Sequence, residues 1–232
     1  MVTGSRGGIG REVVAALGRD GYAVVGLDRA TTGDGATDTE WDCDVTDPGD
    51  CAAAAARLHE RYGRLDAVVH CAGVNTWQPF GEVAPQQARS VFDANVWGTV
   101  NVLLALQDLL RRSDRGSVVA VTSTAGERGV PGTAVYGMTK AAVGSLVRTL
   151  AIEWADVPVR VNAISATIVP TGMNREIRRS PGYLEEKLRT IPLGRMIAAT
   201  EVADTAAFLA GPRSAGITGE TVHVDGGVTA RG

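Results

Sequence analysis

The alternation of short apolar segments with longer helical stretches constrains the fold of this chain most strongly. The apolar segments are Val2 and residues 23–27, 66–71, 117–122, 159–164 and 221–224. Strands that are apolar on both faces are typical of parallel sheets covered by helices on both sides. Because right-handed crossovers join such strands, we expect a doubly wound, Rossmann-like α/β fold with a seven-stranded parallel sheet, formed by residues 1–232 as a single domain.

The helical stretches cover residues 11–20, 85–112 and 134–155, and the alanine run at 52–56 belongs to a further helix. Gly21 is placed to end the first of them. Little chain precedes the glycine-rich residues after Val2, so either the first strand is short or the start of the chain is misassigned. Residues 31–35 show no helical pattern, and we therefore expect the second crossover to be a loop.

The composition excludes several classes of partner. The formal net charge is -3 and no basic stripe is present, which argues against nucleic acid. No apolar run reaches the ~18 residues that cross a bilayer, and the N-terminal residues lack the pattern of a signal peptide, so we expect a cytoplasmic protein without a membrane partner. The three cysteines and three histidines lack ligand spacing, which predicts neither disulfides nor a metal site. Of the 23 basic residues only Lys140 and Lys187 are lysines, a bias that we attribute to a GC-rich genome.

A glycine-rich segment, residues 3–10, lies between the end of a strand and the start of a helix. Glycines allow a sharp turn and a close approach of the backbone to a pyrophosphate, and the helix that follows offers free N–H groups to that anion. The context therefore predicts a dinucleotide-binding loop. The residues expected to contact the cofactor are Gly4, Ser5, Arg6, Gly8, Ile9 and Gly10.

Asp28 ends the next strand, 18 residues after Gly10. A carboxylate there accepts hydrogen bonds from the 2′-hydroxyl of an adenosine ribose and repels a 2′-phosphate, which favours NAD over NADP. Two alternatives remain open at this stage. Arg6 or Arg29 could pair with a 2′-phosphate, and Asp28 could be an ordinary turn residue at the end of a strand.

A tyrosine and a lysine four residues apart, Tyr136 and Lys140, begin the second long helical stretch. This spacing places both on one helix face, where the ammonium group would lower the pKa of the phenol and suit it to proton transfer. An exposed helix pair would show the same spacing. Ser123 follows a strand 13 residues before Tyr136, at the edge where parallel sheets bind ligands. Asn95 lies within the stretch 85–112, although asparagine is a poor helix former.

Taken in order, these residues resemble the classical short-chain dehydrogenase/reductase family along nearly the whole chain. The family's Thr-Gly-x-x-x-Gly-x-Gly motif matches residues 3–10, and its Asn–Ser–Tyr–Lys tetrad matches Asn95, Ser123, Tyr136 and Lys140. The remaining matches are Asp44-Val45 at the adenine, Ala72-Gly73, Arg160-Val161-Asn162 and Asp225-Gly226-Gly227. Two departures are His70-Cys71 in place of two asparagines, and Ala166-Thr167 in place of Pro-Gly.

The resemblance implies an NAD(P)-dependent oxidoreductase that acts on CH–OH donors. In the implied mechanism, Lys140 holds the nicotinamide ribose and lowers the pKa of Tyr136, while Ser123 orients the substrate oxygen. Tyr136 takes the alcohol proton as hydride passes to NAD, and Asn95 holds a water that links Lys140 to solvent. Ile168 and Thr171 would border the nicotinamide carboxamide. The resemblance also implies a homotetramer, or a dimer, formed through stretches 85–112 and 134–155 and the C-terminal strand.

The substrate is less constrained by the sequence. Family topology places Trp77, Thr124, Glu127 and Met173 around the pocket, with Arg128 and Arg175, although each could be a packing or surface residue. The charged segment 175–180 is predicted to form part of a lid. The short second crossover, Asp28 and residues 191–194 are similar to 2,3-dihydro-2,3-dihydroxybenzoate dehydrogenase, and polyol and secondary-alcohol dehydrogenases share several of these features. We therefore expect a hydroxylated small molecule.

Two other functions remain as alternatives. An NADPH-dependent 3-oxoacyl-carrier-protein reductase would use Arg6 and Arg29 for the cofactor, with Arg111, Arg112 and Arg115 as a basic patch for the carrier protein. A non-catalytic dinucleotide-sensing protein is disfavoured, because the chain keeps all four residues of the tetrad.

Overall fold

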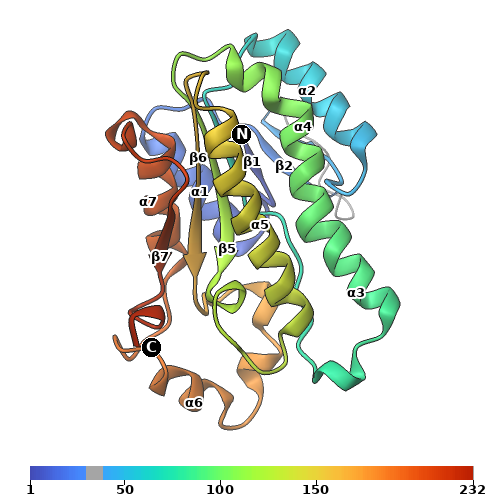
Figure 1. Ribbon diagram of the computed structural model, residues 1–232, viewed down its shortest axis with the longest axis vertical. Coiled ribbons are helices and arrows are strands. Elements are labelled where there is room, and N and C mark those ends of the chain that lie inside the picture. The colour runs from blue at the N-terminus through green and yellow to red at the C-terminus, as the bar shows by residue number, and fades with distance from the viewer. Residues whose placement is uncertain (30–38, 232) are drawn as a thin grey trace.

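One seven-stranded parallel sheet forms the centre of the computed structural model, which describes residues 1–29 and 39–231. The strand order is β3-β2-β1-β4-β5-β6-β7 (Figure 1). The strands are β1 (Val2–Thr3), β2 (Gly26–Asp28), β3 (Glu40–Asp42), β4 (Ala67–His70), β5 (Gly116–Ser123), β6 (Val159–Ala166) and β7 (Thr221–Val224). The predicted doubly wound α/β class is confirmed. The predicted loop at residues 31–35 lies outside the described residues.

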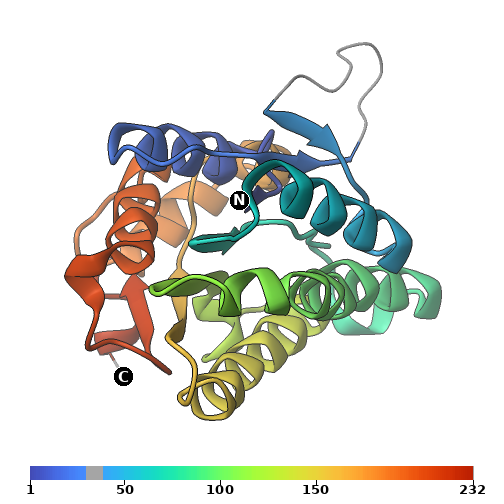
Figure 2. The same cartoon turned by 90° about the horizontal axis from the view of Figure 1, so that it is seen from above.

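Helices cover both faces of the sheet, as Figure 2 shows. Neighbouring residues of a strand point to opposite faces, so Val68 and Val118 pack against one layer while Val69 and Val119 pack against the other. This two-sided burial explains why the central strands are apolar throughout. The layers contain α1 (Gly8–Arg19) and α7 (Ala199–Ala210) on one face, and α2 (Pro48–Tyr62), α4 (Gly98–Arg111) and α5 (Ala134–Glu153) on the other.

The first half of the sheet differs in detail from the sequence prediction. β1 has two residues, and its register pairs Val2 with Gly26 and Thr3 with Leu27. β2 therefore begins at Gly26 and not at residue 23, although the carbonyl of Val25 still accepts a hydrogen bond from the N of Val2 at 2.8 Å. Strand β3 was not assigned from the sequence, since Trp41 is its one buried residue. A short polar edge strand gives no hydropathy signal.

The stretch 85–112 is two helices and not one. A π-helical turn (Asp93–Trp97) separates α3 (Pro85–Phe92) from α4. The side chain of Asn95 lies in this turn and is buried, with its Oδ1 accepting a hydrogen bond from the backbone N of Val74 at 2.8 Å. The irregular turn thus aims a polar side chain into the protein, a common role of such turns at functional sites.

Other helix boundaries also differ from those predicted from the sequence. α1 begins at Gly8, three residues earlier than expected, because the last glycines of the loop already have helical backbone. Gly21 follows its end with φ +84°, as predicted for a helix-terminating glycine. α5 ends at Glu153, and α6 (Tyr183–Arg189) and α7 were not assigned from the sequence. No helix of the described residues is long and apolar enough to cross a membrane.

The packing of α4 against the loop after β3 depends on Gly98. A Cβ at this position would lie 2.7 Å from Cγ2 of Val45, closer than real Cβ contacts allow. We expect Gly98→Ala to destabilise the protein by about 1–3 kcal/mol, because the clash outweighs the gain in helix propensity. Urea titration followed by circular dichroism measures this change.

Gly18→Ala in α1 is the matched control, since no atom of the described residues outside its own stretch of helix lies within 4 Å of the added methyl group. It should leave stability unchanged or raise it by up to about 1 kcal/mol. Equal effects of the two substitutions would contradict the packing argument.

Candidate active site

A cavity of about 610 Å³ opens at the carboxyl edge of the sheet. It is lined by residues that follow or end six strands, β1 to β6: Gly4, Asp28, Asp44, Gly73, Ser123 and Thr167. β1 and β4 are adjacent although β2 and β3 intervene in sequence. The order in which strands are added to the sheet therefore reverses between β1 and β4. Ligands of open α/β sheets bind at such topological switch points, and the volume suits an organic cofactor.

The glycine loop forms the floor of one end of the cavity. Gly4 has φ +64°, and a Cβ there would lie 2.8 Å from the backbone N of Ala72. A Cβ at Gly8 would lie 2.7 Å from Cγ2 of Thr171, on the opposite wall. α1 begins without a side-chain cap and without an acidic residue in its first turn, so its N–H groups remain open to an anion. These features fit a diphosphate.

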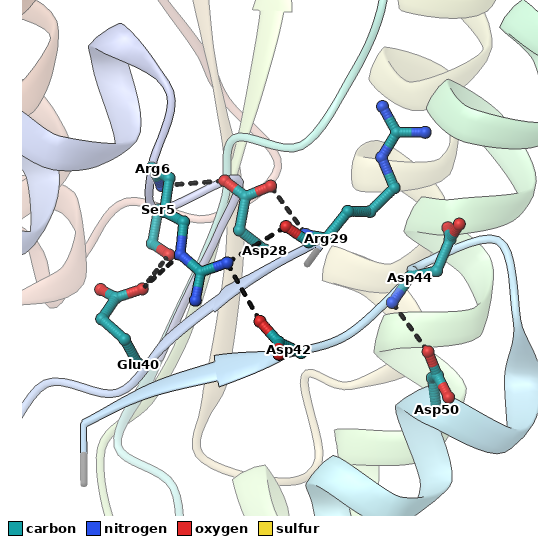
Figure 3. Close-up of polar contacts among 8 residues, drawn as sticks. All are labelled: Ser5, Arg6, Asp28, Arg29, Glu40, Asp42, Asp44 and Asp50. Atoms are coloured by element: carbon teal, nitrogen blue, oxygen red, sulfur yellow. Dashed lines mark hydrogen bonds and ion pairs between the residues drawn. The ribbon is translucent and has the colours of Figure 1, made fainter. Parts of the chain in front are cut away.

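Asp28 lies beside this loop as predicted, with its carboxylate held by two backbone amides (Figure 3). Oδ2 accepts from the N of Arg6 and Oδ1 from the N of Arg29, both at 2.8 Å. Arg6 does not extend freely into the cavity, because its Nη1 donates to Oδ1 of Asp42 at 3.0 Å and its Nε lies 3.9 Å from Oε2 of Glu40. Arg29 points away from this cluster.

Most of the other predicted cofactor contacts also line the cavity. The carboxylate of Asp44 accepts hydrogen bonds from the backbone and hydroxyl of Thr46, and the backbone bond is the largest cause that holds its pKa below the usual value. Ser5 is an exception, because its hydroxyl donates to Oε2 of Glu40 at 2.8 Å and the residue does not line the cavity. The predicted residues that do line it are Gly4, Arg6, Gly8, Ile9, Gly10, Asp28, Asp44, Val45, Ala72, Gly73, Ile168 and Thr171.

Ser123, Tyr136 and Lys140 meet in the same cavity. Ser123 is the last residue of β5, and its side chain hydrogen-bonds to that of Tyr136 near the start of α5. Lys140 lies one turn further along α5, with its Nζ 5.7 Å from the ring centroid of Tyr136. The Nζ donates to the backbone O of Val121 at 2.9 Å. The structure therefore places Tyr136 and Lys140, the pair predicted to share one helix face, in the lining of the same cavity.

The pKa values differ from the expectation that Lys140 lowers the pKa of Tyr136. Burial raises the pKa of Tyr136 to about 12, and the hydrogen bond to Ser123 opposes this only in part. Burial also lowers the pKa of Lys140 to about 8. The physical reason is that both groups are desolvated, and the ammonium group is directed at a backbone carbonyl.

Asn95 fixes the loop that faces Lys140. Its Nδ2 donates to the O of Val74 and to Oγ1 of Thr139, each at 2.9 Å. A Cβ at Gly73 would lie 3.0 Å from Oδ1 of Asn95 and 3.4 Å from Nζ of Lys140, so glycine at this position lets the three groups approach. Asn95 therefore positions the loop, and the π-helical turn supplies the direction of its side chain.

Comparison with known proteins identifies the family. A family model described as "Enoyl-(Acyl carrier protein) reductase" matches residues 4–229. L-xylulose reductase of Bos taurus is 35% identical, over 99% of this chain and 96% of that protein. The short-chain reductase protein NovJ of Streptomyces niveus is 34% identical, over 98% and 92%. The chain belongs to the classical short-chain dehydrogenase/reductase family.

Solved structures agree with this assignment. A gluconate 5-dehydrogenase from Burkholderia cenocepacia, in complex with NADP and tartrate, superposes with a TM-score of 0.91 at 25% identity, over 100% of this chain and 94% of that one. This short-chain dehydrogenase/reductase is accordingly an NAD(P)-dependent oxidoreductase acting on CH–OH donors. That conclusion disfavours the alternative of a sensing protein without turnover.

His70 stands where the family pattern has asparagine, and the structure shows how it is accommodated. It is buried at the end of β4, and its Nδ1 lies 2.8 Å from Oγ1 of Thr3. Burial lowers the pKa of His70 to about 3, with a further contribution from the charge of Lys140. The ring is therefore neutral at physiological pH and serves as an internal hydrogen-bonding group.

The four predicted substrate residues divide into two groups. Trp77, Thr124 and Met173 line the cavity. Glu127 does not line it, and its carboxylate pairs with Nε2 of His223 on β7. The prediction for Glu127 was made from loop position alone, and the short turn after Ser123 directs this side chain toward the neighbouring edge strand.

Sequence reasoning missed Lys187 and Tyr183 on α6. Lys187 lines the cavity, and the ring of Tyr183 packs edge-on against Trp77 with 5.7 Å between centroids. One signal was available, because only two of the 23 basic residues are lysines and both line this cavity. In a chain that otherwise uses arginine, the two lysines could have been singled out, because a compact ammonium group differs from a guanidinium in the contacts it makes.

The buried neutral His70 makes stability depend on pH. Its folded pKa of about 3 lies below the ~6.5 of an unfolded histidine, so the unfolded chain binds more protons as pH falls below 6.5. Stability should therefore fall with pH across this window. Between pH 7.5 and pH 5, we expect the free energy of unfolding of His70→Asn to fall by about 2 kcal/mol less than that of the wild type.

The measurement is the free energy of unfolding in urea at the two pH values. His59→Asn, in α2, is the control and should retain the wild-type dependence. Identical pH dependence in wild type and His70→Asn would show that His70 is protonated in the folded state.

Proposed function

We propose that this short-chain dehydrogenase/reductase transfers hydride between NAD(H) and the carbinol or carbonyl carbon of a hydroxylated small molecule. Residues 1–232 would act as one NAD(P)-binding domain. The observation that carries the proposal is that Ser123, Tyr136 and Lys140 line the cavity whose other end is the glycine loop. A cofactor lying along the cavity would present its nicotinamide to these side chains.

In this mechanism the chain supplies binding, orientation and proton transfer. The bound nicotinamide supplies or accepts the hydride at its C4 atom. Ser123 donates a hydrogen bond to the substrate oxygen and holds it beside the Tyr136 hydroxyl. Tyr136 donates its proton to that oxygen during reduction and takes it back during oxidation. Lys140 offers the N–H groups not used by Val121 to the nicotinamide ribose.

The protonation state of Tyr136 favours reduction of a carbonyl substrate, because the hydroxyl does not have to lose a proton before that reaction. Burial raises the pKa of Tyr136 to about 12, so at neutral pH the hydroxyl carries the proton that a carbonyl substrate would accept. Oxidation requires Tyr136 to lose that proton first. Asn95 holds Thr139, the residue before Lys140, and the missing side chain at Gly73 leaves room for the ammonium group beside the site. There its charge would stabilise a transient phenolate.

The preference for NAD rests on the charges around the adenosine end. Asp42 and Glu40 pair with the guanidinium of Arg6, and the carboxylate of Asp28 accepts a hydrogen bond from its backbone N. A 2′-phosphate would face Asp28 and could not pair with Arg6 unless Arg6 left Asp42. The 2′-hydroxyl of NAD can instead donate to Asp28. The ion pair with Asp42 thus weakens the argument from the sequence that Arg6 binds a 2′-phosphate of NADP. Arg29 remains as the second cation that could bind this phosphate.

The alternative of a 3-oxoacyl-carrier-protein reductase lacks its expected docking patch near the cavity. Arg111 and Arg112 end α4, and Arg115 directly precedes β5. The active-site residue Ser123 is at the opposite end of that strand, roughly 23 Å away at ~3.3 Å per residue. A carrier protein held by these arginines would lie at the wrong end of the sheet.

The names of the relatives support a polyol or sugar substrate. L-xylulose and gluconate, which appear in two of those names, are both polyhydroxylated. Cyclic diols and simple secondary alcohols stay within the proposed substrate class.

The predicted homo-oligomer is supported by exposed apolar residues on the two helices expected to pair, with Leu104 on α4 62% exposed and Ile152 on α5 79% exposed.

Tyr136→Phe tests the proton-transfer role. The substitution removes one oxygen, so kcat should fall by about 10²–10⁴ while NADH affinity stays near that of the wild type. Turnover is measured with NAD or NADH against a panel of polyols, cyclic diols and their ketones, and NADH binding by fluorescence. Tyr62→Phe on α2 is the matched control and should keep full activity. Undiminished turnover by Tyr136→Phe would refute the mechanism.

Asp28→Asn tests the cofactor preference. The wild type should bind NADH more tightly than NADPH, and the variant should lower that ratio by about tenfold or more, because a charged acceptor is lost from the ribose. Asp42→Asn, which releases one Arg6 donor, should raise NADPH affinity without weakening NADH. Both affinities are measured by isothermal titration.

Asp204→Asn on α7 makes the same charge change away from the cavity and serves as control. A wild type that binds both cofactors equally, or an Asp28→Asn variant with an unchanged ratio, would overturn the NAD preference and leave the hydride-transfer proposal intact.

A further inference from the structure

A second pocket of about 390 Å³ continues from the active-site cavity beyond Trp77. The two share Trp77, Val130 and Lys187 as lining residues. α6 contributes Tyr183, Glu186 and Lys187 to the lining of the second pocket. In Figure 1, α6 lies beyond the carboxyl end of the sheet, where a substrate reaching past Ser123 would extend. A substrate can therefore span both pockets.

Two cations face this junction without a compensating acid. Lys187 is half-buried, and within the described residues its ammonium group makes no ion pair and no hydrogen bond. Burial lowers the pKa of Lys187, and the charge of Arg128 across the pocket lowers it further. Arg128 itself donates from Nη1 to the backbone O of Val228 at 3.0 Å, which leaves further guanidinium donors for a ligand. Like charges held together in a partly desolvated place are unfavourable unless an anion joins them.

Two buried hydrogen-bonding groups at the same place also lack partners. Nε1 of Trp77 and the hydroxyl of Tyr183 are buried and, over residues 1–29 and 39–231, neither has a hydrogen-bond partner. The indole N–H can only donate, and the phenol can donate. Unpaired buried polar groups are rare in native proteins, and each calls for an explanation such as a bound water, an ion or a functional role. The unpaired groups and the two cations thus share one chemical preference, for an oxygen acceptor with negative charge.

Among the residues that the structure describes, Glu186 is the one acidic residue lining the second pocket, and it makes no ion pair with Lys187. It is exposed, and it contributes to the raised pKa of Tyr183, behind burial. It is not among the causes that shift the pKa of Lys187. Lys187 is the more buried of the two neighbours on α6, and Arg128 faces it from the loop after β5.

We infer that the junction of the two pockets binds an acidic oxygen group of the substrate, a carboxylate or a phosphate ester, through Lys187, Arg128, Trp77 and Tyr183. The inference rests on the proposed function, because it places the reacting carbinol at Tyr136 and the acidic group beyond Trp77. It names the substrate class more narrowly: a hydroxy acid, its oxo acid, or a sugar phosphate. The neutral polyol of the same carbon chain would lack the contact that holds its far end.

The test compares three ligands that share a six-carbon polyol chain: sorbitol, gluconate and sorbitol 6-phosphate. Binding of each to the enzyme–NADH complex is followed by isothermal titration, and kcat and KM are measured with NAD for any that react. We expect gluconate or sorbitol 6-phosphate to bind at least about tenfold more tightly than sorbitol, the charged hydrogen bonds supplying the difference. The tighter of the two acids identifies the acidic group.

Lys187→Gln should remove this advantage by raising the Kd and KM of the acid about tenfold while leaving sorbitol unchanged. Arg128→Gln should act in the same direction, and Lys187→Arg should restore part of the affinity. Arg213→Gln, which removes a surface charge paired with Asp20, is the matched control and should change nothing. Circular dichroism confirms that each variant is folded.

Equal binding of sorbitol and both acids by the wild type, or no acid binding at all, would overturn the inference. An unchanged preference in Lys187→Gln would overturn it as well. In each of these cases, tight NADH binding with turnover of a neutral alcohol would show that the proposed oxidoreductase function still holds. A wild type that binds no NADH would instead remove the proposed function itself.

Discussion

The close approach of backbone to backbone at the switch point between β1 and β4 is the constraint on which the rest of the structure depends. Gly4 touches the chain at Ala72, and a side chain at Gly10 would overlap the carbonyl of Gly4. This contact brings the open start of α1 next to the ends of β4 and β5. Because the sheet is parallel, every strand then delivers its last residue to the same edge, and one cavity collects groups from remote parts of the chain.

Charge is distributed unevenly along that cavity, and the distribution gives its two ends different tasks. At the adenosine end, carboxylates outnumber the cations they contact, and Arg6 is held by Asp42 and approached by Glu40. At the far end, Lys187 and Arg128 are unmatched by any acid that contacts them within the described residues. Between them, Tyr136 and Lys140 are desolvated, so the protonation of each is set by what binds there. Under the two proposals above, one end would disfavour the 2′-phosphate of NADP, while the other would favour an acidic group of the substrate.

The sequence predicts the parts of this molecule that depend on local pattern. Two-sided burial makes strands such as residues 117–122 apolar throughout, and the spacing of Tyr136 and Lys140 follows from the helical repeat. Features set by tertiary contact escape the same reasoning. The π-helical turn at Asn95 depends on the loop at Val74, and the restraint of Arg6 depends on the polar edge strand β3. The pKa of Tyr136 moves opposite to expectation because burial, which no spacing reveals, outweighs the hydrogen bond to Ser123.

The edge strand β3 shows how a polar residue outside the cavity can still act on the ligand. Glu40 is opposite Gly26 in the register, and a side chain on Gly26 would overlap its carboxylate. The missing side chain lets Glu40 cross β2 and accept a hydrogen bond from Ser5 in the glycine loop. Ser5 and Arg6 are therefore both restrained from the side opposite the cavity, and the loop is held in shape before a cofactor arrives. Preorganisation of this kind reduces the entropy lost on binding, so the acids of β3 favour a dinucleotide without touching it.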